Sequence, residues 1–96
     1  MSASFDFSGR TVIITGGGRG IGLALSRFFA TAGATVAVAD VNEQALAEVL
    51  VDELDGAIPL IADVSDSVSV NAAVEHVLDA TGRIDIVVNN AGILRD

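Results

Sequence analysis

The feature that most constrains this chain is a run of glycines between two apolar stretches. Residues 15–22 read TGGGRGIG, directly after the apolar residues 12–14 and directly before the apolar residues 23–25. This order predicts a tight turn from a buried strand into a helix. Glycines let the backbone turn sharply and let a ligand approach main-chain N–H groups without a β-carbon in the way. Because the first N–H groups of a helix lack partners and its dipole is positive there, we expect an anion such as phosphate to bind at this turn.

The composition excludes several classes of protein. A chain of 96 residues predicts one compact unit without a second domain. A net charge of −8 argues against binding nucleic acid or an anionic membrane surface, since both attract basic proteins. Any bound phosphate must therefore be held by local groups. The lack of cysteine excludes disulfides and thiolate metal sites.

The first six residues lack the basic start and the apolar core of a secretion signal, and no apolar run is long enough to span a bilayer. Together with the absence of cysteine, this predicts a cytoplasmic protein. All five basic residues are arginines, and the sequence contains neither Lys nor Tyr.

Apolar periodicity predicts seven alternating elements. The expected strands are 10–15, 34–40, 57–62 and 84–88, and the expected helices are 20–32, 43–54 and a third that is capped by Ser65 or Asp66 and ends at Thr81-Gly82. With right-handed crossovers, these elements form half of a doubly wound Rossmann fold, a parallel sheet of order 3-2-1-4 with helices on both faces. Pro59 favours an edge position for the third strand, because proline cannot donate to a neighbouring strand. The apolar face of the third helix is expected to hold Val70, Val74, Val77 and Leu78.

The glycine run does not match the strict dinucleotide fingerprint G-x-G-x-x-G in any register, and a P-loop would need a Lys. What is present is T-G-x-x-x-G-I-G, with Gly16, Gly20 and Gly22 at the fixed positions. A purely structural turn is the alternative interpretation.

Asp40 ends the second expected strand, 24 residues after Gly16. A carboxylate there can accept hydrogen bonds from the adenosine ribose hydroxyls and repels a 2′-phosphate, which favours NAD over NADP. Arg19 argues the other way, because a cation beside the turn can attract a 2′-phosphate. No basic residue follows Asp40 directly, so the prediction is NAD. An ordinary polar residue at a strand exit is the alternative.

Polar residues also follow the third and fourth strands. Asp63 can accept a hydrogen bond from the adenine amino group and Val64 can offer a backbone N–H, although Asp63 alone is more typical of a helix cap. The sequence NNAG at 89–92 places amides and a glycine at the same sheet edge, where open α/β sheets bind ligands. Judged alone, it would be a plain turn. His76 and the acidic residues within 48–55 are interpreted as surface positions, so no catalytic or metal-binding residue is predicted.

Taken together, TGGGRGIG, Asp40, Asp63-Val64 and NNAG resemble the classical short-chain dehydrogenase/reductase family in order and spacing over essentially the whole chain. The resemblance implies an NAD(P)-binding half of an oxidoreductase, with the pyrophosphate at the glycine turn, the adenosine ribose on Asp40 and adenine near Asp63. The contacts it implies for the cofactor are Gly16, Gly18, Arg19, Gly20, Ile21, Gly22, Asp40, Asp63, Val64, Asn90, Ala91 and Gly92.

The resemblance stops where the family's catalytic residues begin. The family uses a Tyr as acid and base, a Lys four residues later, a Ser and a further Asn, all beyond the fourth strand. Because this chain has no Tyr and no Lys, we expect it not to catalyse the family's proton transfer alone. It looks like the N-terminal half of such an enzyme.

Three hypotheses follow from this resemblance. The chain is a module that binds NAD or an adenine nucleotide; it is a fragment of an oxidoreductase acting on an alcohol or ketone when the other half is supplied; or it is a truncated or designed scaffold without a ligand. In each case the strand at 84–88 leaves an open apolar edge. We expect a homodimer, or association with the missing C-terminal half, through this edge.

Overall fold

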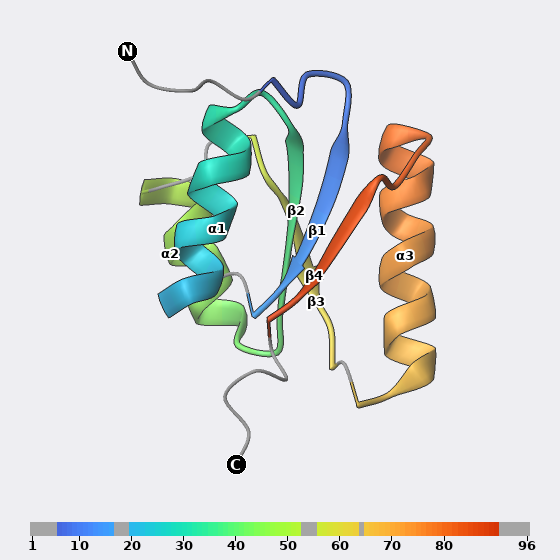
Figure 1. Ribbon diagram of the computed structural model, residues 1–96. Coiled ribbons are helices and arrows are strands. Elements are labelled where there is room, and N and C mark those ends of the chain that lie inside the picture. The colour runs from blue at the N-terminus through green and yellow to red at the C-terminus, as the bar shows by residue number, and fades with distance from the viewer. Residues whose placement is uncertain (1–5, 17–19, 53–55, 64, 91–96) are drawn as a thin grey trace.

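The computed structural model describes residues 6–16, 20–52, 56–63 and 65–90, in which strands and helices alternate as predicted (Figure 1). The seven elements are β1 (Thr11–Thr15), α1 (Gly20–Thr31), β2 (Thr35–Asp40), α2 (Glu43–Asp52), β3 (Ile58–Ile61), α3 (Ser67–Thr81) and β4 (Ile86–Asn89). No helix within these ranges combines the length and the apolar character needed to cross a membrane.

The four strands form one parallel sheet in the order β3-β2-β1-β4. In Figure 1, α1 and α2 lie on one face of this sheet and α3 lies on the other. The predicted half-Rossmann architecture is therefore confirmed. β3 lies at an edge, as expected from Pro59.

The core lies on both faces of the two central strands. β1 is buried along its whole length, and β2 is buried from its second residue onward. Because successive side chains of a strand point to opposite faces, each of these strands supplies both layers. The layer facing α1 and α2 contains Val12, Ile14, Val36, Val38 and Leu46, and the layer facing α3 contains Ile13, Ala37, Ala39, Leu60 and Val77.

The third helix is capped at both ends. The Asp66 side chain accepts a hydrogen bond from the Val68 N–H at 3.0 Å, so Asp66 is the N-cap of the two candidates. At the other end, Gly82 has a φ of 82°, and its N–H donates to the Leu78 carbonyl at 2.8 Å. A residue with a β-carbon would be strained at this φ, which explains the glycine.

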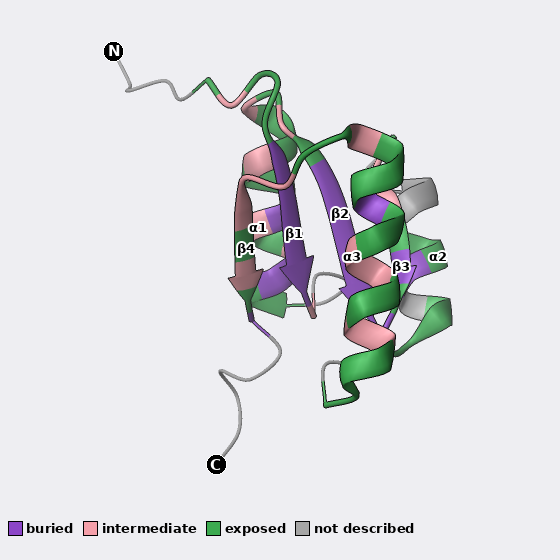
Figure 2. Ribbon diagram, turned by 90° about the vertical axis from the view of Figure 1, so that its right-hand side faces the viewer, coloured by how far each residue is buried: buried purple, intermediate pink, exposed green. Residues whose placement is uncertain are grey.

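The apolar face of α3 is buried only in part. Val77 is fully buried, whereas Leu78 is 43% exposed. Figure 2 shows α3 over the side of the sheet that holds β2 and β3, with β4 uncovered on this face. Val87 of β4 is 60% exposed. Apolar surface therefore remains open on the α3 side of the sheet.

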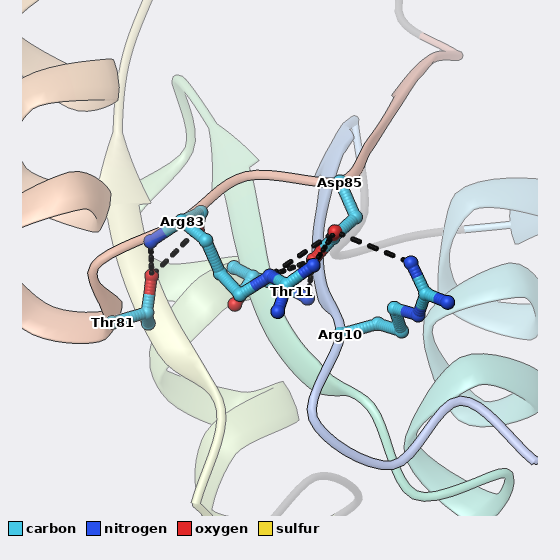
Figure 3. Close-up of polar contacts among 5 residues, drawn as sticks. All are labelled: Arg10, Thr11, Thr81, Arg83 and Asp85. Carbon is cyan, nitrogen blue, oxygen red and sulfur yellow. Dashed lines mark hydrogen bonds and ion pairs between the residues drawn. The ribbon is translucent and has the colours of Figure 1, made fainter.

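The strand β4 begins at Ile86 rather than at the predicted residue 84, because its pairing with β1 begins where Ile86 lies opposite Val12. Ile84 packs against the core layer facing α3. The Asp85 carboxylate binds several donors (Figure 3). The Arg83 guanidinium donates to both of its oxygens, at 2.9 and 2.6 Å, and Arg10 lies 3.6 Å away. The hydrogen bonds from Arg83, together with one from the Thr11 N–H, hold the pKa of Asp85 below its usual range.

Candidate functional site

The carboxyl ends of β1, β2 and β4 meet at one edge of the sheet, at the lower end in Figure 1, where α1 also begins. Gly16 directly follows β1, Asp40 is the last residue of β2, and Asn90 directly follows β4. The Gly16 N–H donates to the Ala39 carbonyl at 2.6 Å, which holds the glycine turn beside the end of β2. The fold therefore brings together residues that the sequence analysis took from three separate segments.

Each described glycine of the turn has a conformational or steric reason to be glycine. Gly16 and Gly20 have φ values of 65° and 54°, in the left-handed region that residues with a β-carbon rarely adopt. Gly22 is needed for space, because a β-carbon there would overlap the Gly16 carbonyl oxygen and lie 2.8 Å from Asn90 Nδ2. The turn is thus packed tightly against the first turn of α1 and the end of β4.

The first helical turn of α1 presents a polar backbone and one apolar side chain at this edge. α1 begins at Gly20, so the positive end of its dipole lies at the carboxyl ends of the strands. Ile21 is 57% exposed beside it. Unpartnered N–H groups at a helix start bind anions, and an exposed apolar side chain nearby can contact a ring or a ribose.

Asp40 holds a carboxylate at the end of the central strand β2. The residue is only 5% exposed, and its Oδ1 accepts a hydrogen bond from the Asn42 N–H at 3.1 Å. This contact orients the carboxylate at the turn into α2. Val41, the next residue, is 62% exposed and was not singled out from the sequence. The local sequence gives no sign of its exposure beyond its place between a strand and a helix.

Asp63 serves the entry to α3. Its Oδ1 accepts hydrogen bonds from the Ser65 hydroxyl at 2.6 Å and the Ser65 N–H at 2.9 Å, and these bonds lower the pKa of Asp63. Its own N–H donates to the Ser69 hydroxyl at 3.0 Å. These contacts order the segment before α3, whose N-cap is Asp66. They leave Asp63 exposed at the end of β3, within the same sheet edge.

Asn90 lies against the glycine turn. It is 6% exposed, and its side-chain Nδ2 donates to the Gly16 carbonyl at 3.4 Å. One residue earlier, Asn89 Oδ1 lies 3.1 Å from the Thr15 hydroxyl, which also lies 3.3 Å from the Val88 carbonyl. This link between Thr15 and Asn89 was not predicted from the sequence. The signal for this link is that Thr15 and Asn89 are polar residues at the ends of two neighbouring strands.

Some of the predicted site lies outside the described residues. These positions are Gly18, Arg19, Val64, Ala91 and Gly92. The described part nevertheless contains Gly16, Gly20, Ile21, Gly22, Asp40, Asp63 and Asn90 at one edge of the sheet.

A hollow lies beside the start of α3. It has a volume of about 250 Å³ between α3 and β3, and its lining includes Pro59, Ile61, Ser69 and His76. His76 is exposed, which agrees with its interpretation as a surface residue. This hollow shares none of the predicted cofactor contacts.

Comparison with known proteins assigns the chain to a family. A family model described as short chain dehydrogenase matches residues 10–96. The chain belongs to the short-chain dehydrogenase family. The resemblance carried by the glycine turn, Asp40, Asp63-Val64 and NNAG is therefore confirmed. Members of this family bind NAD(H) or NADP(H) on a Rossmann fold.

Curated relatives of this short-chain dehydrogenase chain are considerably longer. Oxidoreductase UcpA of Salmonella typhimurium is 44% identical over 92 residues, which cover 92% of this chain and 34% of the relative. D-threitol dehydrogenase of Mycolicibacterium smegmatis is 41% identical, with 99% of this chain and 38% of the relative covered. The chain thus spans about a third of the length of these relatives.

Solved structures share the fold. A 3-ketoacyl-(acyl-carrier-protein) reductase from Brucella melitensis, complexed with NADH, matches with a TM-score of 0.80 and 34% identity over 85% of this chain and 34% of that chain. Hydroxysteroid dehydrogenase from Escherichia coli matches with a TM-score of 0.81 and 36% identity over 88% of this chain and 37% of that chain. Both likenesses agree with the α/β architecture described above for this short-chain dehydrogenase chain.

Proposed function

We propose that residues 1–96 are the dinucleotide-binding half of a short-chain dehydrogenase-type oxidoreductase and that they bind NAD in preference to NADP. The observation that carries the proposal is the close approach of Gly22 to the Gly16 carbonyl and to Asn90, beside the start of α1. This packing leaves no room for a β-carbon. It holds the glycine turn and the end of β4 against the start of α1, where backbone N–H groups bind anions.

The glycine turn is the proposed pyrophosphate site. The contacts we assign to it are Gly16, Gly18, Arg19, Gly20, Ile21 and Gly22. The positive φ values of Gly16 and Gly20 and the start of α1 at Gly20 fit this role. Because the chain carries a net charge of −8, the local dipole and N–H groups must attract the phosphates against the overall charge.

Asp40 is the proposed determinant of NAD preference. Its carboxylate is buried and oriented by the Asn42 N–H at the end of β2. A negative charge in this place accepts hydrogen bonds from ribose hydroxyls and repels a 2′-phosphate, and repulsion is strong where water is excluded. The reductase from Brucella melitensis was solved in complex with NADH.

The remaining proposed contacts surround the adenosine and the sheet end. Asp63 and Val64 are placed near adenine, and Asn90, Ala91 and Gly92 near the ribose and the carboxyl end of β4. The local bonds of Asp63 with Ser65 leave its exposed carboxylate at the correct edge for a contact with the adenine amino group.

In the proposed enzyme, a bound nicotinamide cofactor supplies the hydride chemistry, and this chain's residues bind and orient the cofactor. An alcohol or ketone is the proposed substrate class. Transfer of the substrate proton needs an acid and base matched to that task, and the family's Tyr and Lys have no counterpart in this sequence. We therefore propose that these 96 residues do not catalyse the reaction alone.

The edge of β4 is the proposed association surface, for a second copy or for a C-terminal half of the enzyme. β4 pairs with β1 on one side. β4 is the last strand in the order β3-β2-β1-β4, so no described strand pairs with its other side. Light scattering at high protein concentration tests the homodimer, and a monomeric mass would refute it. A cytoplasmic location stays a prediction from the sequence.

Isothermal titration calorimetry with NAD and NADP tests the proposed cofactor preference. We expect the wild-type chain to bind NAD about tenfold or more tightly than NADP, because a like charge opposite the 2′-phosphate disfavours NADP. Asp40→Asn keeps the size of the side chain and removes its charge. The ratio of the Kd for NADP to the Kd for NAD should therefore fall toward one. Absence of binding at millimolar NAD would instead support the scaffold hypothesis and refute the proposal.

A further inference from the structure

One polar side chain at the candidate site is held at only one of its two polar atoms. Asn90 is 6% exposed and its Nδ2 donates to the Gly16 carbonyl at 3.4 Å, at the long end of the hydrogen-bond range. Among the described residues, no donor reaches its buried Oδ1. The amide is therefore oriented by the glycine turn through its donor, Nδ2.

The crowding at Gly22 explains why this orientation matters. The Gly16 carbonyl oxygen and Asn90 Nδ2 both occupy the space into which a β-carbon of Gly22 would extend. The carbonyl thus points inward, toward the helix backbone and the amide. If the same carbonyl turned outward, its negative end would oppose the positive end of α1 at the start of that helix.

We propose that Asn90 is a positioning residue for the dinucleotide and acts through the Gly16 carbonyl. Its amide N–H keeps this carbonyl turned away from the anion site. The inference rests on the proposed function, because it concerns the same site. It assigns to Asn90 the role of a donor that no carboxylate can replace at neutral pH.

The variant Asn90→Asp tests this role because its donor depends on pH. The introduced carboxyl is nearly isosteric with the amide but can donate to the Gly16 carbonyl only when it is protonated. Burial should raise its pKa. A matched control is Asn89→Asp, which adds the same charge one residue away and retains the acceptor that faces the Thr15 hydroxyl.

The measurement is the Kd for NAD by calorimetry between pH 5 and pH 8, each variant being compared with wild type at the same pH. We expect Asn90→Asp to bind about tenfold or more weakly at pH 8, the effect of losing a donor to a buried carbonyl, and to recover toward wild type at pH 5. For Asn89→Asp, the ratio of its Kd to the wild-type Kd should stay constant from pH 5 to pH 8. Wild-type affinity throughout, or a deficit that does not change with pH, would overturn the inference.

A second measurement separates this inference from the proposed function. If wild type fails to bind NAD, the proposed function and the positioning role both fail, but the contact with Gly16 can still be read from stability without ligand. A carboxyl with a raised folded-state pKa stabilises the fold at low pH, and this stabilisation is lost as pH rises through that pKa. Asn90→Asp should therefore lose stability relative to Asn89→Asp between pH 5 and pH 8. A constant difference would show that the contact does not exist.

Discussion

Asp85 and Thr11 exchange two hydrogen bonds across the start of neighbouring strands. The Asp85 N–H donates to the Thr11 carbonyl at 2.9 Å, and the Thr11 N–H donates to Asp85 Oδ2 at 2.8 Å. Since Thr15 and Asn89 are linked at the other end, β4 is fixed to β1 at both of its ends. This arrangement sets the position of Asn90 against the glycine turn.

Low pH should weaken the hydrogen bond between the Thr11 N–H and the Asp85 carboxylate, because the carboxylate becomes protonated. The pKa of Asp85 is lowered in the folded state, chiefly by hydrogen bonds from Arg83 and then by the Thr11 N–H. Its stabilisation is therefore fully present above the unfolded-state pKa of about 3.9 and is lost as pH falls through the lower folded-state value. Urea unfolding from pH 6 to pH 2 should show that Asp85→Asn is less stable at pH 6 and loses less stability on acidification than wild type.

The control for this experiment is Glu75→Gln, at an exposed position on α3, which removes the same formal charge. Asp6 and Asp63 also have lowered pKa values, so some acid sensitivity should remain in Asp85→Asn. An acid profile for Asp85→Asn that parallels that of wild type would contradict the assigned role.

Gly22→Ala should destabilise the fold although alanine is the better helix former. Helix propensity alone predicts a gain of up to about 1 kcal/mol. The new β-carbon would overlap the Gly16 carbonyl, and overpacking of this kind typically costs about 1–3 kcal/mol. Urea unfolding decides between the two effects by the sign of the change. A variant as stable as wild type, or more so, would show that the turn adapts.

Ile14→Ala should cost about 3 kcal/mol of unfolding free energy, since Ile14 is fully buried in the core layer facing α1 and α2. Ile14→Val should cost about 1 kcal/mol, because it removes a single methylene. Val68→Ala is the exposed control at 74% exposure and should change stability by no more than about 0.5 kcal/mol. Equal losses of unfolding free energy in Ile14→Ala and Val68→Ala would contradict the assignment of Ile14 to the core.

Asp66→Ala should destabilise α3 by about 1 kcal/mol, because the Val68 N–H would lose its acceptor at the helix start. Asp66→Ser restores a capping oxygen and should recover most of the loss. Urea unfolding measures both changes. If the serine variant is as unstable as the alanine variant, the effect of Asp66 does not arise from capping.

The sequence predicted the fold well because its signals are local. Continuous apolar runs, glycine helix ends and the single proline each depend on residues close together in the chain, and right-handed crossovers then leave few possible strand orders. The same locality explains why the predicted site residues Gly16, Asp40 and Asn90 lie at one edge of the sheet. The order of the strands follows from the pattern, and the carboxyl ends of parallel strands must share an edge.

The sequence predicted less of the contacts within the site. Asn90 and Gly16 are 74 positions apart, and their contact depends on the register of β1 with β4, which no local pattern contains. The start of β4 depends on the same register, because its pairing with β1 begins at Ile86 opposite Val12. Leu78 matched the helical spacing but stays partly exposed, since α3 does not cover the whole sheet face.

The central claim is that the glycine turn and the ends of β2 and β4 form one dinucleotide site. The most direct measurement is a titration of the ¹⁵N-labelled chain with NAD, followed by backbone amide shifts in NMR spectra. We predict the largest shifts at Gly16, Gly20, Gly22, Asp40 and Asn90. Shifts should be small at Asp85, which lies at the other end of the strands. Shifts confined to the hollow between α3 and β3, or no shifts at millimolar NAD, would contradict the claim.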